Sequence, residues 1–273
     1  MGGFKFAHNC CFLLFIGTPR SGHSIIGAIL DAHPNALVSH EFHALKKISE
    51  GWTGNQLMNG IISTSVKQAA EGRSQSEIDH GDEYYLEAEP TQAKYRFDYS
   101  IPNQFQGQID GRIEVIGDKK GGGSTTILAE IPELLQKLRD AVNLPIKLIY
   151  VVRNPYDNIS TMAFRSGNSL ISQVKEYRWY IENIHEILER ETHECLTIYQ
   201  EDFIMDTKQQ LELICNWLKL DSSPSYIEDA ASIVYKNPHE SRNRLEWGDI
   251  ERNEVENVIK KWPVLSRYKQ PHN

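Results

Sequence analysis

The sequence predicts an α/β fold in which helices cover both faces of a central parallel sheet. Three short apolar runs have the length and composition of buried strands: Cys11–Ile16, Ile146–Val152 and Cys195–Tyr199. Apolar residues recur at helical spacing in two further stretches, Ile171–Leu188 and Leu211–Leu218. Strands that alternate with helices form parallel sheets, because each connection must cross back over a face of the sheet.

The chain has 273 residues, and we treat 1–273 as one domain because this length suits a single α/β core. Its 40% hydrophobic and 24% charged residues are typical of a soluble globular protein. A net charge of −8 argues against nucleic acid or a heavily sulfated polysaccharide as the main partner, since both require a broad basic surface. The cysteines form no CxxC pair and are expected to be reduced thiols: Cys10, Cys11, Cys195 and Cys215.

The N-terminal apolar run is short and leads directly into a glycine-bearing loop. It therefore predicts a strand rather than a signal peptide. No apolar run reaches the length of a transmembrane helix. On these grounds we expect a cytoplasmic protein without a transmembrane segment.

The loop from Gly17 to Ser24 carries the first functional signal. It connects the first strand to a helix that is expected to start near Ile25. This arrangement gathers free backbone N–H groups at the positive end of the helix dipole and makes an anion site. The spacing is that of a Walker A loop, GxxxxGK[ST], with His23 in place of the lysine. Because nucleotide hydrolases need that lysine on the β- and γ-phosphates, the loop is predicted to hold a phosphate-like group other than a triphosphate.

The residues Thr18-Pro-Arg-Ser-Gly-His-Ser24 resemble the 5′-phosphosulfate-binding loop of sulfotransferases that use 3′-phosphoadenosine 5′-phosphosulfate (PAPS). The resemblance implies that this loop binds the donor through Arg20, Ser21, Gly22, His23 and Ser24. His23 departs from the threonine or serine that is usual there. The sequence leaves open whether it assists the chemistry or only donates a hydrogen bond.

A second motif, Val151-Val-Arg-Asn-Pro-Tyr-Asp-Asn-Ile-Ser160, follows a later strand. Arg153 leaves the carboxyl end of that strand, where open α/β sheets bind ligands, and its guanidinium can grip a phosphate. Ser160 is about two helical turns away and is expected to add a hydroxyl. The alternative is an Arg–Asp salt bridge at the strand end, with Ser160 on a helix surface. The segment resembles the 3′-phosphate-binding motif of the same enzymes, and both motifs together favour a sulfotransferase.

The candidate base lies after a short strand over Ala36–Ser39. The preceding Leu30-Asp-Ala-His-Pro-Asn35 resembles a stretch of tyrosylprotein sulfotransferases and many bacterial relatives, in which a glutamate a few residues later is the base. Glu41 is therefore our candidate, although an ungapped count favours His40. If the strand continues through both residues, their side chains should point to opposite sides.

A candidate for stabilising the leaving group lies after the strand Ile113–Gly117. Gly-Asp-Lys resembles a strand end that carries a catalytic lysine in relatives, which implies that Lys119 has this role, with Lys120 as its rival. The alternative is a pair of solvated lysines before a glycine turn at Gly121–Gly123. The next helix is expected to start near Pro132.

Two weaker features concern the nucleotide. Tyr199 lies in a Tyr-Gln-Glu-Asp-Phe segment that resembles a Y-E-D-L element of sulfotransferases, and it is expected either to flank the nucleotide or to pack in the core. Arg242 or Arg244 is expected at the 3′-phosphate, as in the basic tail segments of relatives. The R-K-G-x-x-G-D-W segment of the cytosolic hormone-type enzymes is absent, so the chain resembles the tyrosylprotein and bacterial branch.

Residues 44–112 are polar and show weak hydrophobic periodicity, with tyrosines at 84, 85, 95 and 99. We expect a cap of helices and loops over the acceptor site, and a disordered insertion is the alternative. The resemblance implies a P-loop NTPase-like three-layer fold that carries this cap. It also implies transfer of a sulfuryl group from PAPS to a hydroxyl or amine, with no metal.

The acceptor cannot be read from the sequence, and neither can the oligomeric state. A lipid, polyketide, sugar or other small molecule would suit, as would a protein hydroxyl. Two other functions are alternatives: a small-molecule or nucleotide kinase with a degenerate P-loop, and a non-catalytic nucleotide-binding module. The missing Walker lysine and terminal aspartate argue against the kinase. The candidate catalytic residues argue against the silent module.

Overall fold

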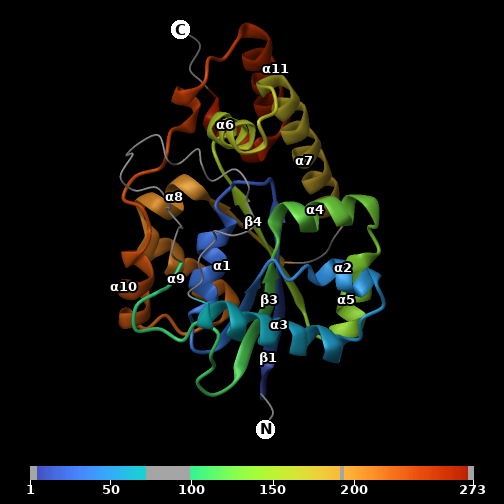
Figure 1. Ribbon diagram of the computed structural model, residues 1–273, viewed down its shortest axis with the longest axis vertical. Helices are drawn as coiled ribbons and strands as arrows, with labels where there is room; N and C mark the ends of the chain where they lie inside the picture. Colours follow the sequence, from blue (N-terminus) through green and yellow to red (C-terminus); the bar gives the residue numbers. More distant parts are fainter. Residues whose placement is uncertain (1–4, 72–98, 191–193, 270–273) are drawn as a thin grey trace.

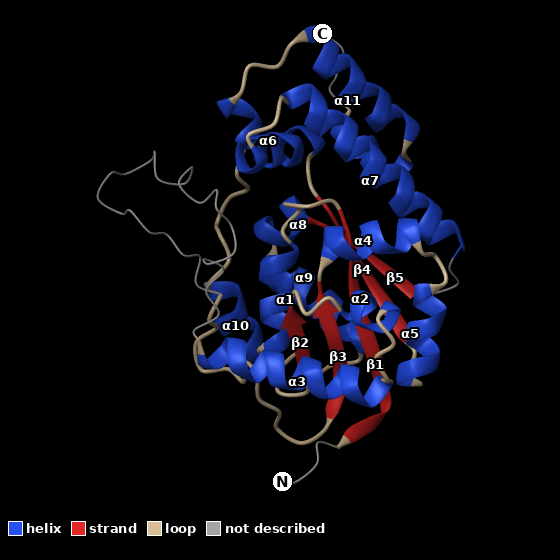
Figure 2. Ribbon diagram, turned by 45° about the vertical axis from the view of Figure 1, so that its right-hand side comes forward, coloured by secondary structure: helices blue, strands red, loops and turns tan. Residues whose placement is uncertain are grey.

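A computed structural model describes residues 5–71, 99–190 and 194–269. Five parallel strands form one sheet in the order β2-β3-β1-β4-β5, and Figure 2 shows them side by side in this order. The strands are β1 (Phe6–Gly17), β2 (Ala36–His40), β3 (Ile113–Lys119), β4 (Ile146–Val152) and β5 (Glu194–Tyr199). Because all of them are parallel, their carboxyl ends meet at one edge, where a ligand site is expected.

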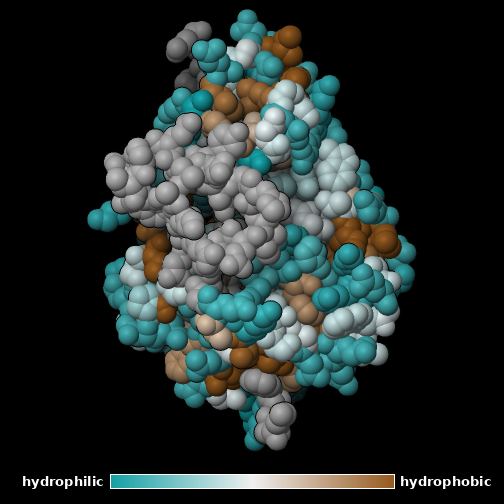
Figure 3. Space-filling view, in the orientation of Figure 1, coloured by the Kyte–Doolittle hydropathy of each residue, from teal (hydrophilic) through white to brown (hydrophobic). Residues whose placement is uncertain are grey.

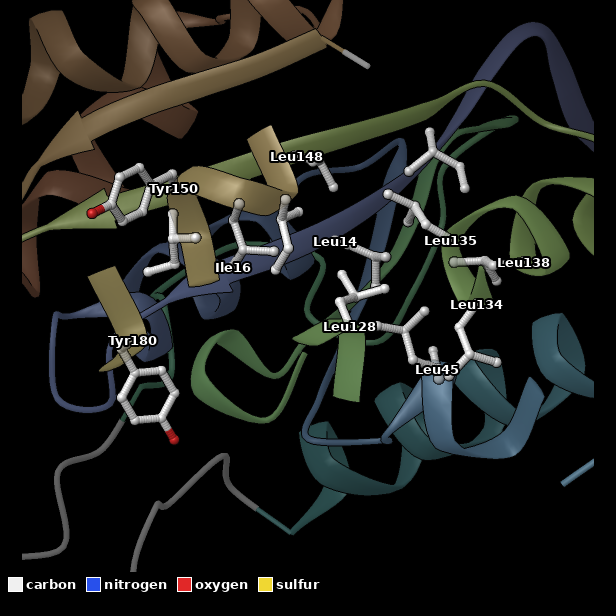
Figure 4. Close-up of a cluster of buried hydrophobic side chains, with 14 of the residues drawn as sticks. Leu14, Ile16, Leu45, Leu128, Leu134, Leu135, Leu138, Leu148, Tyr150 and Tyr180 are labelled. Atoms are coloured by element: carbon white, nitrogen blue, oxygen red, sulfur yellow. The ribbon is translucent and has the colours of Figure 1, made fainter. Parts of the chain in front are cut away.

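Alternate residues of β1 face two separate parts of the core. Leu13 and Phe15 contribute to one part, which is completed by α1 (His23–Asp31), α8 (Gln200–Met205), α9 (Thr207–Leu218) and α10 (Pro224–Ser232). Leu14 and Ile16 contribute to the other, where Figure 4 shows them among side chains of β4 and of the covering helices. A strand that is buried on both faces needs a continuous apolar run, which is what its sequence contains.

The second face of the sheet is covered by a larger set of helices. These are α2 (Ala44–Ser49), α3 (Gly54–Ala70), α4 (Gly121–Glu130), α5 (Leu134–Val142), α6 (Pro155–Ser166), α7 (Leu170–Arg190) and α11 (Asp249–Lys261). Figures 1 and 2 place α6 and α11 beyond the carboxyl ends of the strands. Short helical turns η2 (Ser241–Arg244) and η3 (Pro263–Tyr268) flank α11. The predicted α/β fold with a parallel sheet covered on both faces is therefore confirmed.

Local signals explain where α6 begins and ends. The side chain of Asn154 caps the helix by accepting from Tyr156 N at 3.0 Å. Pro155 occupies the first turn, where its missing N–H costs nothing. Gly167 ends the helix in a left-handed conformation with φ 69°.

The alternative of a glycine turn at Gly121–Gly123 is wrong, because helix α4 begins at Gly121. Packing outweighs the poor helix propensity of glycine here. Thr125 of this helix bonds the end of β1, accepting from Gly17 N at 2.9 Å. The expected later helix is present as α5. Four strands are longer than expected: β1 covers Phe6–Gly17, β2 reaches His40, β3 reaches Lys119 and β5 begins at Glu194.

Part of the expected cap is described. Helix α3 lies against the edge strand β2 and against α5, and its first turn has a capping box formed by Thr53 and Gln56. The buried carboxylate of Asp31 joins this helix to the core, accepting from Ser65 Oγ at 2.5 Å and from Gly107 N at 3.0 Å. Residues 72–98 lie outside the described residues, and the cap remains an expectation.

The four cysteines have free thiols. Polar side chains cover most of the face drawn in colour in Figure 3. No helix among the described residues is long and apolar enough to span a membrane. Within the same residues, no group of three or more His, Cys, Asp and Glu side chains could hold a metal ion.

Candidate active site

The loop between β1 and α1 has the backbone of an anion-binding turn. Arg20 and Gly22 are left-handed, with φ 66° and 98°. Gly22 precedes the first turn of α1, and no side chain caps that turn. The first N–H groups of a helix have no partner within the helix, and they lie at the positive end of its dipole. Arg20 is partly buried.

The side chain of Asn158 in α6 fixes this loop through hydrogen bonds. Its Oδ1 lies within hydrogen-bond distance of the hydroxyls of Thr18 and Ser21, the latter at 3.2 Å, and its Nδ2 donates to Pro19 O at 2.6 Å. Ser21 is fully buried, and its single hydroxyl hydrogen can go either to Asn158 Oδ1 or to Thr18 O, which lies closer at 2.8 Å. The side chain of Ser21 thus shapes the loop.

His23 packs behind the loop. Its Nε2 lies 3.1 Å from Ile16 O, and because a carbonyl only accepts, this nitrogen carries the hydrogen. Burial, together with the nearby ammonium of Lys119, lowers the pKa of His23 to about 4. The ring is therefore neutral at physiological pH. It supports β1 by donating a hydrogen bond.

Lys119 connects the loop to the candidate bases. It is 3% exposed, and its Nζ lies 3.0 Å from Ser24 Oγ, 3.1 Å from Glu41 Oε1 and 3.3 Å from His40 Nε2. An ammonium only donates, so these contacts use its three hydrogens and make His40 Nε2 an acceptor. The expectation of solvated lysines is wrong for Lys119.

Glu41 lies between two lysines. Lys120 Nζ is 2.6 Å from its second carboxylate oxygen, opposite the contact with Lys119. Burial alone would raise the pKa of Glu41, but the two lysines outweigh it and hold the pKa well below its ordinary value. Burial and Lys119 lower the pKa of His40 to about 3. At neutral pH the site therefore contains an ionised Glu41 and a neutral His40.

The turn after β2 aims both candidate bases at the same ammonium. The strand ends at His40, and Glu41 and His43 are left-handed, with φ 57° and 63°. The buried carboxylate of Asp118 fixes this turn by accepting from Phe42 N and from Ala44 N, each at 2.8 Å. The condition under which His40 and Glu41 would point to opposite sides is not met, because the strand ends at His40 and Glu41 is left-handed.

Arg153 lies at the carboxyl end of β4 and is 6% exposed. Its Nη1 donates to Arg20 O at 3.1 Å and to Thr161 Oγ1 at 3.0 Å. Its Nη2 donates to His239 O at 3.2 Å and to Ser241 Oγ at 3.1 Å. The guanidinium thus joins the loop after β1 to the segment before η2.

A scan of protein-family models matches residues 13–224 to the sulfotransferase family. The chain belongs to the sulfotransferase family. The matched residues contain every element of the site except the segment around η2.

Solved structures of sulfotransferases share the fold. A sulfotransferase domain from the curacin biosynthetic pathway is 14% identical, with a TM-score of 0.51, and the match covers 96% of this chain and 99% of that one. A sulfotransferase domain from the olefin synthase of Synechococcus PCC 7002 is 15% identical, with a TM-score of 0.52, and covers 99% and 98%. A search of curated protein sequences finds no match. This chain therefore has the P-loop NTPase-like fold that these sulfotransferase structures share.

In this sulfotransferase, the hydroxyl of α6 that accepts a hydrogen bond from Arg153 belongs to Thr161, whereas the sequence predicted that of Ser160. Ser160 is fully buried, and its hydroxyl has no hydrogen-bond partner among the described residues. The alternative that placed Ser160 on a helix surface is therefore wrong, and the expected role of Ser160 at the 3′-phosphate stays a prediction. Counting turns from Arg153 missed this, because the helix begins only at Pro155 and its register decides which hydroxyl faces back.

The remaining predicted residues lie around the C-terminal segment. Tyr199 donates to Val264 O at 3.0 Å, and the guanidinium of Arg267 lies 4.3 Å from the centre of its ring. Arg242 is bound by Asp157, with Nη1 at 2.8 Å from the carboxylate. Arg244 is exposed. The structure therefore brings Arg242 close to the Arg153 region, while Tyr199 packs against η3.

Sequence reasoning missed several supporting residues. Asn158 and Asp118 hold the two turns of the site, and Gln200 packs on Gly22, where an added Cβ would lie 3.0 Å from its Cγ. Asn158 lies inside the second motif, and Asp118 directly precedes Lys119. These positions next to predicted site residues are the sequence signal that could have indicated their supporting roles. Nothing in the sequence around Gln200 indicates its contact with the loop.

Proposed function

We propose that this sulfotransferase transfers a sulfuryl group from PAPS to a hydroxyl or amine acceptor by in-line displacement. The observation that carries the proposal is the position of Lys119. One buried ammonium contacts the loop hydroxyl Ser24 and both candidate bases, Glu41 and His40. A loose sulfuryl transfer needs such a cation between the donor loop and the group that takes the proton.

The chemistry follows from these positions. The acceptor oxygen or nitrogen forms a bond to sulfur while the bond between sulfur and the bridging 5′-phosphate oxygen breaks. The electron pair leaves with adenosine 3′,5′-bisphosphate, whose developing negative charge Lys119 stabilises. The acceptor proton passes to Glu41 or His40.

Two groups of residues fit the two anionic ends of the donor. At the 5′ end, the uncapped first turn of α1, Arg20 and Ser24 offer N–H groups, a guanidinium and a hydroxyl. At the 3′ end, Arg153 offers a buried guanidinium with Thr161 beside it. Arg153 also bonds Arg20 O, so the two groups belong to one continuous surface.

Glu41 remains our choice of base, with His40 as its rival. Glu41 is ionised, and when the donor draws Lys119 toward the leaving group its pKa should rise from its lowered value. His40 is neutral at the same pH and already uses Nε2 as an acceptor from Lys119. Both geometries allow proton uptake once Lys119 shifts.

A kinase is less consistent with the site. Magnesium-dependent P-loop enzymes use the loop serine or threonine and a strand-end aspartate to hold the metal. Here Ser24 Oγ accepts from Lys119, and the strand-end Asp118 spends its oxygens on backbone N–H groups of the turn after β2. Lys119 thus supplies a positive charge from the protein itself.

The test is transfer of radiolabelled sulfate from ³⁵S-PAPS to a panel of phenols, alcohols and amines and to cell extract, with and without chelator. We expect a labelled product whose formation does not change when divalent cations are removed. Phosphoryl transfer from ATP that stops with chelator would contradict the proposal and favour the kinase.

A further inference from the structure

Two helices of the site contain glycine where alanine would favour the helix more. Gly27 lies within α1, and Gly121–Gly123 open α4. Glycine lowers helix stability, so its presence indicates a neighbour that needs the space.

The neighbour of Gly27 is Lys119. A β-carbon at position 27 would lie 2.7 Å from Lys119 Cγ and 2.9 Å from Lys119 Cβ. These atoms belong to the start of the side chain, which follows the fixed backbone of β3 and cannot swing away freely. The stem of Lys119 therefore lies flat against α1 on its way to Ser24 and Glu41.

The glycines of α4 have similar neighbours. A β-carbon at Gly123 would lie 2.8 Å from Lys120 Cγ and 2.9 Å from Lys120 Cε. One at Gly121 would meet the His23 ring at 2.5 Å, and one at Gly122 would lie 2.9 Å from Pro19 Cγ. The start of α4 thus accommodates two residues of the loop after β1 and one of the lysines that bind Glu41.

We propose that Gly27 and Gly123 are positioning residues: they let Lys119 and Lys120 lie flat on α1 and α4, so that both ammonium groups reach Glu41. An alanine at either position would push one lysine away and leave the other in place. The two glycines therefore set separately the two contacts of one carboxylate, at 3.1 Å and 2.6 Å.

This inference rests on the proposed roles of Lys119 and Glu41, but its test needs neither donor nor acceptor. The His40 ring reports the place of Lys119, because Nε2 accepts from that ammonium. In Gly27→Ala, His40 should lose this bond, and its pKa should rise by about one unit or more. Long-range ¹H–¹⁵N spectra of the histidine rings, assigned with His40→Gln, follow both the tautomer and the titration.

Gly123→Ala is the matched variant, because Lys120 bonds Glu41 and not His40. Its His40 titration should change less than in Gly27→Ala, because Lys120 lowers the pKa of His40 less than Lys119 does, while the ¹³C signal of the Glu41 carboxyl should titrate at higher pH. In a Lys119→Met background, adding Gly27→Ala should leave His40 unchanged, since no ammonium remains to be moved.

A folded Gly27→Ala protein whose His40 titrates as in the native chain would overturn the proposal for Gly27. An unchanged Glu41 titration in Gly123→Ala would overturn it for Gly123, and this variant decides alone if Gly27→Ala does not fold. Should the shifts occur while no sulfuryl transfer is found, the positioning role stands and the proposed function fails.

Discussion

The two ends of the candidate active site hold their cations in different ways. Where β2 and β3 end, Lys119 and Lys120 are ion-paired with Glu41. Where β4 ends, Arg153 donates to two carbonyl oxygens and two hydroxyls. At Lys119 a phosphate has to compete with the carboxylate of Glu41, whereas at Arg153 the contacts named here are with neutral oxygens. We therefore expect substitutions near Arg153 to change donor affinity, and substitutions near Glu41 to change turnover.

The largest effect is expected at Glu41. Glu41→Ala should still bind adenosine 3′,5′-bisphosphate, while turnover should fall by about 10²–10⁴ because the base is lost. Steady-state rates and calorimetry on the same preparation check both parts. His40→Ala is the matched control, since it removes the other neighbour of Lys119.

The control can also reverse the assignment. If Glu41→Ala keeps nearly full activity and His40→Ala is inactive, His40 is the base. If both variants stay active, the acceptor is activated by a group outside this pair or needs no protein base. A large loss of bisphosphate affinity in Glu41→Ala would contradict the expectation that the Glu41 end controls turnover and the Arg153 end controls donor affinity.

The next effect concerns the neutral His23 behind the loop. Its pKa is about 4 in the folded protein against an ordinary value of 6.5, so between these values the unfolded chain binds more protons. The contribution of His23 to the free energy of unfolding should be fully present above about pH 6.5. It should fall by about 3 kcal/mol as the pH drops toward 4. Urea unfolding across this window should show a smaller loss in His23→Gln, whose amide can still donate to Ile16 O. Equal pH slopes in both proteins would show that His23 titrates normally.

At the other end, Arg153→Ala should weaken bisphosphate binding about tenfold to a hundredfold, because one charge-assisted phosphate contact is worth roughly 1.5–3 kcal/mol. Turnover at saturating donor should change less than affinity. Arg242→Ala tests the second residue that is predicted at the 3′-phosphate, whose guanidinium Asp157 and Glu240 already bind. Equal losses in the two variants would indicate that Arg242 also binds this phosphate, and a loss in Arg242→Ala alone would contradict the role of Arg153.

The smallest effect separates two adjacent hydroxyls of α6. Thr161→Val removes the hydroxyl next to Arg153 and should weaken bisphosphate binding several-fold, as expected for a hydrogen bond worth about 1 kcal/mol. Ser160→Ala should leave the affinity unchanged. If the same calorimetry shows a loss of affinity in Ser160→Ala and none in Thr161→Val, Ser160 is the hydroxyl that binds the 3′-phosphate.

The sequence predicted the parts of the fold that depend on local pattern. Buried parallel strands such as β1 and β4 need continuous apolar runs, so they were visible without the structure. Helix α4 was not, because its glycines argue locally for a turn and only their packing against His23 and Lys120 explains the helix. Propensity is a weak guide where tertiary contacts decide.

The candidate site divides in the same way. Arg153 and Lys119 follow strands and were predicted from position, since parallel strands end at one edge. The approach of His40 and Glu41 to one ammonium depends on left-handed backbone at Glu41, which Asp118 stabilises from a different strand. A contact between residues so far apart in the chain leaves no trace in a local pattern.

The central claim is that the loop after β1 and Arg153 bind opposite phosphates of one nucleotide. Calorimetry of the native protein with adenosine 3′,5′-bisphosphate and with AMP tests it directly, because the two ligands differ only in the 3′-phosphate. We predict that the bisphosphate binds at least about tenfold more tightly, and that Arg153→Ala removes most of this difference. Equal affinity of the native protein for the two nucleotides would contradict the account.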